Sequence, residues 1–225
     1  MTTNGMNFDF QQLLEVPVGE ATLTGELAVP AGAQALVIFS HGSGSSRLSS
    51  RNNFVASVLH QQGIATFLFD LLTPEEDTNY PNRFAIPLLT GRLIATTDFL
   101  DTLAPVAGLT FGYFGASTGS ASALAAAARM PRRIRAVVSR GGRPDLAGPL
   151  LSQVQAATLL IVGGEDGSVL ALNRQALPAL AGPKRLVVVP NASHLFEEPG
   201  TLQQAAALAA DWFVSYLLPV PHPTR

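Results

Sequence analysis

Residues 108–123, with the sequence GLTFGYFGASTGSASA, join an apolar segment typical of a strand to a run of small helix-forming residues. Ser117 lies at the join, and Gly115 and Gly119 flank it two residues away on each side, which completes the pattern Gly-x-Ser-x-Gly. A serine on so sharp a strand-to-helix turn has strained backbone angles, and the positions around it must lack bulk. The stretch therefore predicts an exposed, nucleophilic Ser117. A glycine-rich turn that serves packing alone is the alternative.

Composition limits the class of protein. The chain has 225 residues, enough for one sizeable core, with 47% hydrophobic and 13% charged residues. Its formal charge is −2, and no basic cluster stands out, so we expect no nucleic-acid partner and no anionic membrane surface. The apolar stretches are shorter than the roughly 18 residues that a membrane span needs. We expect small neutral molecules as partners.

The ends of the chain and the absence of cysteine add further limits. Without cysteine there are no disulfides, thiolate-bound metals or thiol nucleophiles. The polar start of the chain lacks the pattern of a signal peptide, so we expect a cytoplasmic protein. We predict a flexible segment at 1–10, a single domain over 11–218 and a loose, proline-rich tail at 219–225.

Apolar periodicity predicts strands that alternate with helices. An antiparallel pair at 11–19 and 21–30 is expected to come first, at the edge of the sheet. Later strands are predicted at 35–40, 64–69, 134–139, 158–162 and 185–189 and before Ser117; helices are predicted at 51–62, 88–103, 144–153, 171–180 and 201–218 and after Ser117. Residues 70–87 form the longest segment expected to be irregular. This order predicts an α/β fold, with a mostly parallel central sheet covered by helices on both faces.

Two loops after predicted strands carry the partners that a serine nucleophile needs. A serine hydroxyl attacks only when a base takes its proton, and a carboxylate must hold that base in one tautomer. Asp166 follows the strand 158–162, and His194 follows the strand 185–189. Because parallel strands bring their carboxyl ends to one edge of a sheet, we predict a catalytic triad of Ser117, Asp166 and His194.

Other histidines and carboxylates are weaker candidates. His60 on a helix and His222 in the tail are expected to be solvated, whereas His41 is expected to hold the glycine loop that follows it. Asp145 is the rival acid, but it suits the first turn of a helix, where a carboxylate faces the helix dipole. Asp70 ends a strand, and we expect it to fix the long loop.

Acyl transfer also needs donors for the developing oxyanion. The main-chain N–H of Thr118 is one candidate, and that of Ser43, in the loop after the strand 35–40, is the second, with Gly44 as the next choice. This loop lacks both the phosphate-loop and the dinucleotide-binding patterns, and no histidine and carboxylate cluster suggests a metal. No cofactor and no metal are therefore expected.

Several motifs together resemble the α/β hydrolases, in particular the dienelactone-hydrolase-like branch, from about residue 16 to residue 218. They are HGSGSS (41–46), FDLLTPEE (69–76), GASTG (115–119), SRGGRPD (139–145) and HLFEEP (194–199). The likeness is to a subgroup of small bacterial hydrolases that also occurs fused to phosphoribosyltransferase domains, although we expect no second domain here. Dienelactone hydrolases proper carry cysteine at the elbow, so Ser117 makes the resemblance imply a serine esterase of open substrate specificity.

The expected function is hydrolysis of carboxylic esters through an acyl-enzyme on Ser117. The expected substrates are short-acyl esters or lactones. Only a short helix fits between 139 and 158, so no lid domain is expected, and the pocket should be open, with walls from 73–86 and 47–53. A non-catalytic α/β-hydrolase scaffold that serves as an accessory or binding module is one alternative. A thioesterase or an acyltransferase is another. We expect a monomer or a small homo-oligomer.

Overall fold

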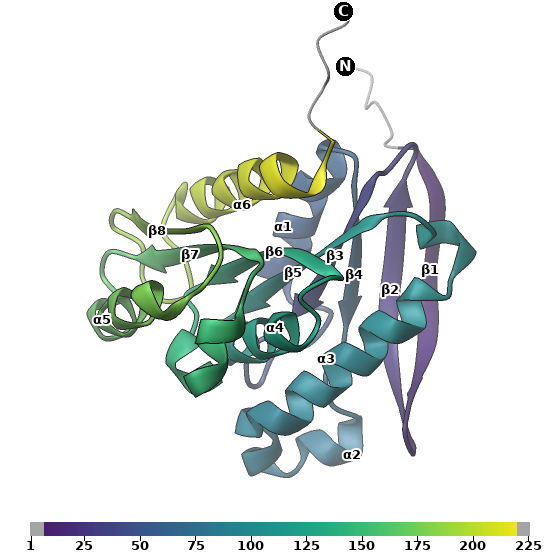
Figure 1. The fold of residues 1–225 in the computed structure, drawn as a ribbon, viewed down its shortest axis with the longest axis horizontal. Helices are drawn as coiled ribbons and strands as arrows, with labels where there is room; N and C mark the ends of the chain where they lie inside the picture. Colours follow the sequence, from purple (N-terminus) through teal and green to yellow (C-terminus); the bar gives the residue numbers. More distant parts are fainter. Residues whose placement is uncertain (1–6, 220–225) are drawn as a thin grey trace, which may run out of the picture.

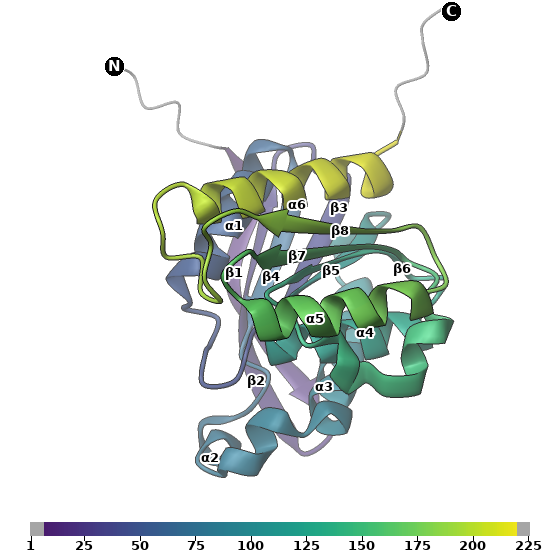
Figure 2. The same cartoon turned by 90° about the vertical axis from the view of Figure 1, so that its left-hand side faces the viewer.

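An eight-stranded sheet forms the centre of the computed structural model, which describes residues 7–219 (Figures 1 and 2). The strand order is β1-β2-β4-β3-β5-β6-β7-β8. The pairs β1/β2 and β2/β4 are antiparallel, and all other neighbours are parallel. The strands are β1 (Phe8–Val18), β2 (Ala21–Pro30), β3 (Ala35–Ser40), β4 (Ile64–Phe69), β5 (Thr110–Ala116), β6 (Ile134–Arg140), β7 (Ala157–Gly163) and β8 (Lys184–Val189). The predicted α/β class is confirmed.

Helices cover both faces of the sheet (Figures 1 and 2). One face carries α1 (Ser50–Gln61) and α6 (Thr201–Leu217), and the other carries α3 (Ile86–Asp101), α4 (Thr118–Arg129) and α5 (Gly167–Ala176). Shorter segments are α2 (Pro74–Asp77) and four 3₁₀ turns, η1 (Tyr80–Phe84), η2 (Ala104–Val106), η3 (Pro144–Gln153) and η4 (Leu177–Ala179).

The central elements are buried on all sides, as their sequences indicate. Every residue of β3 and β4 is buried, which matches the continuous apolar runs of strands covered on both faces. In α4 every residue from Thr118 to Ala128 is buried, and its alanines and serines let the helix lie close to the sheet. The buried hydroxyl of Ser122 is hydrogen-bonded to that of Ser40 at 2.8 Å, so it carries no unpaired polar group into the core.

The first strand begins earlier than expected. Residues 8–10 were predicted to be flexible, but they belong to β1, where Phe8 pairs with Pro30 of β2. The Phe8 ring also lies edge-on to the His60 ring, with 5.2 Å between centroids. A partner strand and a contact with helix α1 thus order this segment. The predictions for residues 1–6 and 220–225 lie outside the described residues, and the proposed single domain stays a prediction.

Three segments differ from the predicted secondary structure. Residues 70–87 are not irregular, because they contain α2 and η1, and the N-cap residue Thr73 forms a reciprocal capping box with Glu76. The predicted helix at 144–153 is instead the 3₁₀ segment η3, broken at Gly148, whose φ is 54°. Helix α5 also begins at Gly167, four residues before its predicted start.

The expected absence of an insertion after β6 agrees with the structure. Between β6 and β7 the chain forms only the short segment η3, so no lid domain interrupts it there. Among residues 7–219 we find no helix with the length and apolar character needed to cross a membrane.

Candidate active site

Ser117 lies on a strained turn between β5 and α4. Its φ and ψ are 51° and −124°, a region that few residues other than glycine adopt. A Cβ atom at Gly119 would overlap the carbonyl oxygens of Ser40 and His41, and one at Gly115 would overlap the backbone of Ser120, so neither position has room for a side chain. The predicted close approach of strand and helix is therefore present.

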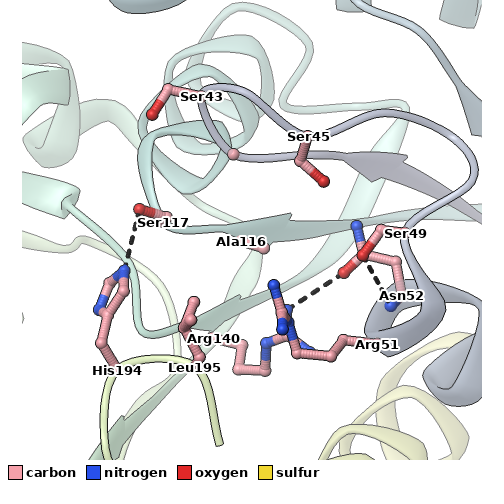
Figure 3. A pocket seen from close by; sticks show the side chains of 11 residues that line it. Ser43, Ser45, Ser49, Arg51, Asn52, Ala116, Ser117, Arg140, His194 and Leu195 are labelled. Carbon is pink, nitrogen blue, oxygen red and sulfur yellow. Dashed lines mark hydrogen bonds between the residues drawn. The ribbon is translucent and has the colours of Figure 1, made fainter.

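The structure brings Ser117, His194 and Asp166 together at the carboxyl end of the sheet (Figure 3 shows Ser117 and His194). The Oγ atom of Ser117 lies 3.2 Å from Nε2 of His194, and Nδ1 of His194 lies 2.6 Å from Oδ2 of Asp166. A carboxylate only accepts, so Nδ1 carries the proton and Nε2 is free to accept from the serine hydroxyl. The Asp166 side chain is 11% exposed, whereas that of His194 is 38% exposed and open to a ligand.

Contacts near His194 fix the loop that carries it. The carboxylate of Glu198 accepts a hydrogen bond from the main-chain N–H of Ser193 at 3.0 Å, and hydrogen bonding from Ser193 lowers the pKa of Glu198. Phe196 has a φ of 57° and a fully buried ring, which anchors the loop on its other side. In the sequence, Glu198 and Phe196 are recognisable only as members of the motif HLFEEP (194–199).

The rival acid does not contact the imidazole. Asp145 forms a bidentate ion pair with Arg143, with oxygen–nitrogen distances of 2.9 and 2.8 Å. It does lie in the first turn of η3, where a structural role was expected, and its hydrogen bond raises the pKa of Arg143. Asp166 is thus the carboxylate that the fold places beside His194.

The prediction that His60 is solvated is wrong. The structure places it partly buried, with Nε2 2.7 Å from the hydroxyl of Thr66, and burial lowers its pKa. The other histidine predicted to be solvated, His222, lies outside the described residues.

His41 holds the glycine loop, as expected. Its Nε2 accepts from the main-chain N–H of Leu71 at 3.1 Å, so Nδ1 is the protonated nitrogen and donates to the carbonyl oxygen of Gly42 at 2.9 Å. Burial lowers the pKa of His41 and favours this neutral form. Asp70 was expected to fix the long loop at 70–87, but its carboxylate instead accepts from the main chain and the guanidinium of Arg47, in the loop that follows β3, at 2.7 and 2.6 Å.

The two candidate oxyanion donors differ in the resting structure. The main-chain N–H of Thr118 has no hydrogen-bond acceptor in the described chain. The main-chain N–H of Ser43 already donates to the hydroxyl oxygen of Thr118 at 2.9 Å. The glycine loop and the start of α4 are therefore joined directly beside Ser117.

A cavity of about 280 Å³ opens beside Ser117 (Figure 3). Its wall includes Ser49, Arg51 and Asn52, from one of the two segments expected to form it. The other expected wall, 73–86, contributes no residue to this cavity. Arg83, from that segment, instead lines a separate small cavity near Gly44. Within residues 7–219 no group of His, Asp or Glu side chains is arranged to hold a metal ion. The lining residues are Gly42, Ser43, Ser45, Ser49, Arg51, Asn52, Ala116, Ser117, Arg140, His194 and Leu195.

Comparison with solved structures identifies relatives of this chain. A dienelactone hydrolase from Anabaena variabilis is 53% identical, with a TM-score of 0.90 over 93% of this chain and 99% of that one. The chain belongs to the dienelactone hydrolase family. Est1E from Butyrivibrio proteoclasticus, at 14% identity and a TM-score of 0.77, covers 90% of this chain and 98% of its own and shares the α/β-hydrolase fold. No family model matches the chain.

The curated relatives of this dienelactone hydrolase family member are named after another activity. A Mycobacterium tuberculosis protein named as a phosphoribosyl transferase is 56% identical over 204 residues, which are 91% of this chain but 46% of that protein. The chain thus spans about half the length of the curated relatives it matches. This agrees with the resemblance to hydrolases fused to phosphoribosyltransferase domains. Family membership supports a hydrolase of the ester-cleaving type.

Sequence reasoning on this dienelactone hydrolase family member missed three polar residues of the cavity. Arg140 was noted only within a motif, and Arg51 and Asn52 only as parts of a wall. A signal was present in SRGG (139–142), because an arginine at the end of a strand buried on both faces is unusual.

Proposed function

We propose that the chain is a serine esterase that cleaves carboxylic esters through an acyl-enzyme on Ser117. The observation that carries the proposal is the continuous line of hydrogen bonds from Ser117 through His194 to Asp166, at the edge of a cavity. In this arrangement the base is hydrogen-bonded to the nucleophile and is itself oriented by a carboxylate.

The reaction runs in two halves. The Ser117 oxygen attacks the ester carbonyl carbon while Nε2 of His194 takes the hydroxyl proton, and the same nitrogen then protonates the departing alcohol. A water molecule, activated by His194, next attacks the acyl-enzyme and releases the acid. The carboxylate of Asp166 stabilises the imidazolium that forms in each half.

The main-chain N–H groups of Thr118 and Ser43 are proposed to bind the oxyanion. The Thr118 group is unpaired in the described structure and follows the nucleophile directly. The Ser43 group would share its proton between the Thr118 hydroxyl and the oxyanion, because the hydroxyl already accepts it. Such donors are already oriented before the charge develops.

The substrate is proposed to be a small ester or lactone with a short acyl group. The cavity of about 280 Å³ is lined mainly by small or polar side chains, and no lid domain follows β6 to enlarge it. We propose that the reaction needs no cofactor and that the protein acts as a monomer or a small homo-oligomer.

A fluorophosphonate probe tests the proposal against a non-catalytic scaffold. Such a probe forms a covalent bond with an activated serine, so the wild-type protein should be labelled at Ser117 and the Ser117→Ala variant should not. An unlabelled wild-type protein would favour the scaffold. A thioesterase or an acyltransferase would be labelled as well, and product analysis with a competing thiol or alcohol separates these activities from hydrolysis.

A further inference from the structure

Two residues link helix α5 to the candidate active site. Asp166 directly precedes its first turn, and the Asp166 carboxylate accepts from His194 instead of capping the helix. Asn173 lies about two turns further along α5. Its Nδ2 group donates to the carbonyl oxygen of Gly142, in the turn that follows β6, at 2.9 Å. One helix therefore contacts the site both at the proposed acid and at the turn after β6.

The side chain of Asn173 is fully buried, which is uncommon for an amide. Its Nδ2 group also donates to the carbonyl oxygen of Val169, one turn earlier in α5, at 2.8 Å. Two carbonyl acceptors on one nitrogen fix the orientation of the amide. Within residues 7–219 the buried Oδ1 atom has no hydrogen-bond donor. An unpaired buried oxygen costs free energy, so the two donated bonds must outweigh this cost or serve the site.

The turn at 140–143 supports the backbone of Ser117. The main-chain N–H of Ser117 donates to the carbonyl oxygen of Arg140, and that of Arg143 donates to the carbonyl oxygen of Ser117, both at 3.1 Å. Gly142 lies between these two links and has no room for a side chain, because a Cβ atom would overlap the hydroxyls of two neighbouring serines. Surrounding contacts of this kind hold the strained φ of 51° at Ser117.

The turn at 140–143 also lies beside the imidazole of His194. A Cβ atom at Gly141 would lie 3.5 Å from Nδ1 and 3.2 Å from the carbonyl oxygen of His194. The main-chain N–H of Gly141 donates to the carbonyl oxygen of Ile161 in β7 at 2.8 Å, which fixes this part of the turn to the sheet. The turn thus contacts both Ser117 and His194, whose reacting atoms are 3.2 Å apart.

We propose that Asn173 is a positioning residue of the Ser117 site. Its bond to Gly142 ties the turn at 140–143 to α5, so the helix that presents Asp166 to the imidazole also holds the turn beside the nucleophile. The inference rests on the proposed ester hydrolysis and adds a residue outside the cavity to it. Because Asn173 acts through the orientation of Ser117 and His194, its loss affects kcat more than KM.

Stabilisation of the fold alone is the competing explanation, because buried hydrogen bonds between elements stabilise a protein wherever they occur. Thr97 of α3 provides a matched control. Its fully buried hydroxyl donates to the carbonyl oxygen of Leu93, one turn earlier, at 2.7 Å, and is hydrogen-bonded to the hydroxyl of Tyr113 in β5 at 2.6 Å. Neither Thr97 nor Tyr113 lines the cavity beside Ser117. Thr97→Val therefore removes a link of the same kind away from the site.

Two variants separate the bond to Gly142 from the bond within α5. Asn173→Leu keeps the size of the side chain and removes both bonds. Asn173→Ser keeps a donor for the carbonyl four residues earlier, but its hydroxyl is one bond shorter than the amide and loses the link to Gly142. With 4-nitrophenyl acetate, we expect both variants to lower kcat by about 10- to 100-fold and to keep KM within about threefold of wild type, because small displacements of reacting groups are costly. Thr97→Val should keep the wild-type kcat.

The rate of labelling by the fluorophosphonate probe provides a second measurement, because it reports the activation of Ser117 without turnover. It should fall in both Asn173 variants and stay unchanged in Thr97→Val. Melting temperatures of all the proteins show how much each change affects stability. A lower melting temperature with wild-type kcat and labelling rate would assign Asn173 to the fold and overturn the positioning role. An equal loss of kcat in Thr97→Val, or failure of both Asn173 variants to fold, would overturn it as well.

The labelling of the wild-type protein separates this inference from the proposed function. Wild-type protein that is labelled at Ser117, together with Asn173 variants that are labelled equally fast, would overturn the positioning role and leave the esterase intact. Wild-type protein that is not labelled would overturn the proposed function, and the positioning role with it. Slower labelling and a lower kcat in both Asn173 variants, but not in Thr97→Val, support the positioning role.

Discussion

The main-chain N–H of Ser43 donates to the hydroxyl oxygen of Thr118, so the two residues expected to bind the oxyanion are hydrogen-bonded to each other at 2.9 Å. Ser43 belongs to the loop after β3, and Thr118 begins α4 after β5. The bond holds the glycine loop against the start of the helix, and the Thr118 side chain therefore has a positioning role besides that of its main-chain amide.

Replacing Thr118 tests this link. We expect Thr118→Val to lower kcat by about 10- to 100-fold with a smaller change in KM, which is less than the 10²–10³-fold cost of losing a whole oxyanion donor. Thr118→Ser keeps the hydroxyl and should stay within a few-fold of wild type. Steady-state kinetics on a short-acyl ester measures both variants, and equal losses in the two would argue against a role for the hydroxyl.

Ser117 and His194 are expected to act as a unit. Ser117→Ala and His194→Ala should each remove nearly all turnover, and the double variant should lose little more, because neither group functions without the other. Turnover of the three purified variants is the measurement. Losses that simply multiply would count against proton transfer between Ser117 and His194.

Asp166 and Asp145 should behave differently when each becomes asparagine. Asp166→Asn should lower kcat on the order of 10⁴-fold, because an amide no longer holds the His194 tautomer that accepts the serine proton. Asp145→Asn breaks a partly exposed ion pair with Arg143 and should cost about 1 kcal/mol of stability or less, with turnover nearly kept. Kinetics and urea unfolding of both variants give the comparison. The opposite ranking would reassign the acid.

Acyl-chain length is expected to affect rate only for short chains. Each methylene adds about 0.8 kcal/mol only if it is buried, and a cavity of about 280 Å³ is too small to bury a long acyl chain. The ratio kcat/KM should therefore stop rising after the first few methylenes, without activation when the substrate forms micelles or droplets. A steady rise through long chains would reveal an apolar tunnel that this cavity lacks.

The buried histidines predict how stability depends on pH. Burial lowers the pKa of His41 and His60 in the folded protein from 6.5, so the unfolded chain binds more protons as the pH falls. Their contribution to the free energy of unfolding is complete above about pH 6.5 and declines below it. Urea unfolding between about pH 7.5 and pH 5 should show this loss. It should be smaller in His41→Gln and in His60→Gln and smallest in the double variant, and equal slopes in all four proteins would contradict it.

Local sequence was enough to predict the order of strands and helices and the turn at Ser117. Continuous apolar runs such as 35–40 are typical of strands buried on both faces of a parallel sheet, and glycines two residues from Ser117 leave room for a sharp turn. Strand order then predicts that loops far apart in the chain meet at one edge, which is where the structure places Asp166 and His194.

Tertiary structure alone decided the features that depend on distant neighbours. Pairing with β2 orders residues 8–10, and side-chain caps and ion pairs order α2 and η1, although neither segment has a marked periodicity of its own. The hydrogen bond from Arg140 to Asn52 joins the end of β6 to the first turn of α1. Periodicity predicts which face of an element is buried. The burial of the Arg140 guanidinium without a carboxylate partner among residues 7–219 depends instead on side chains far apart in the sequence, such as Asn52, 88 residues away. Only the folded chain brings these side chains together.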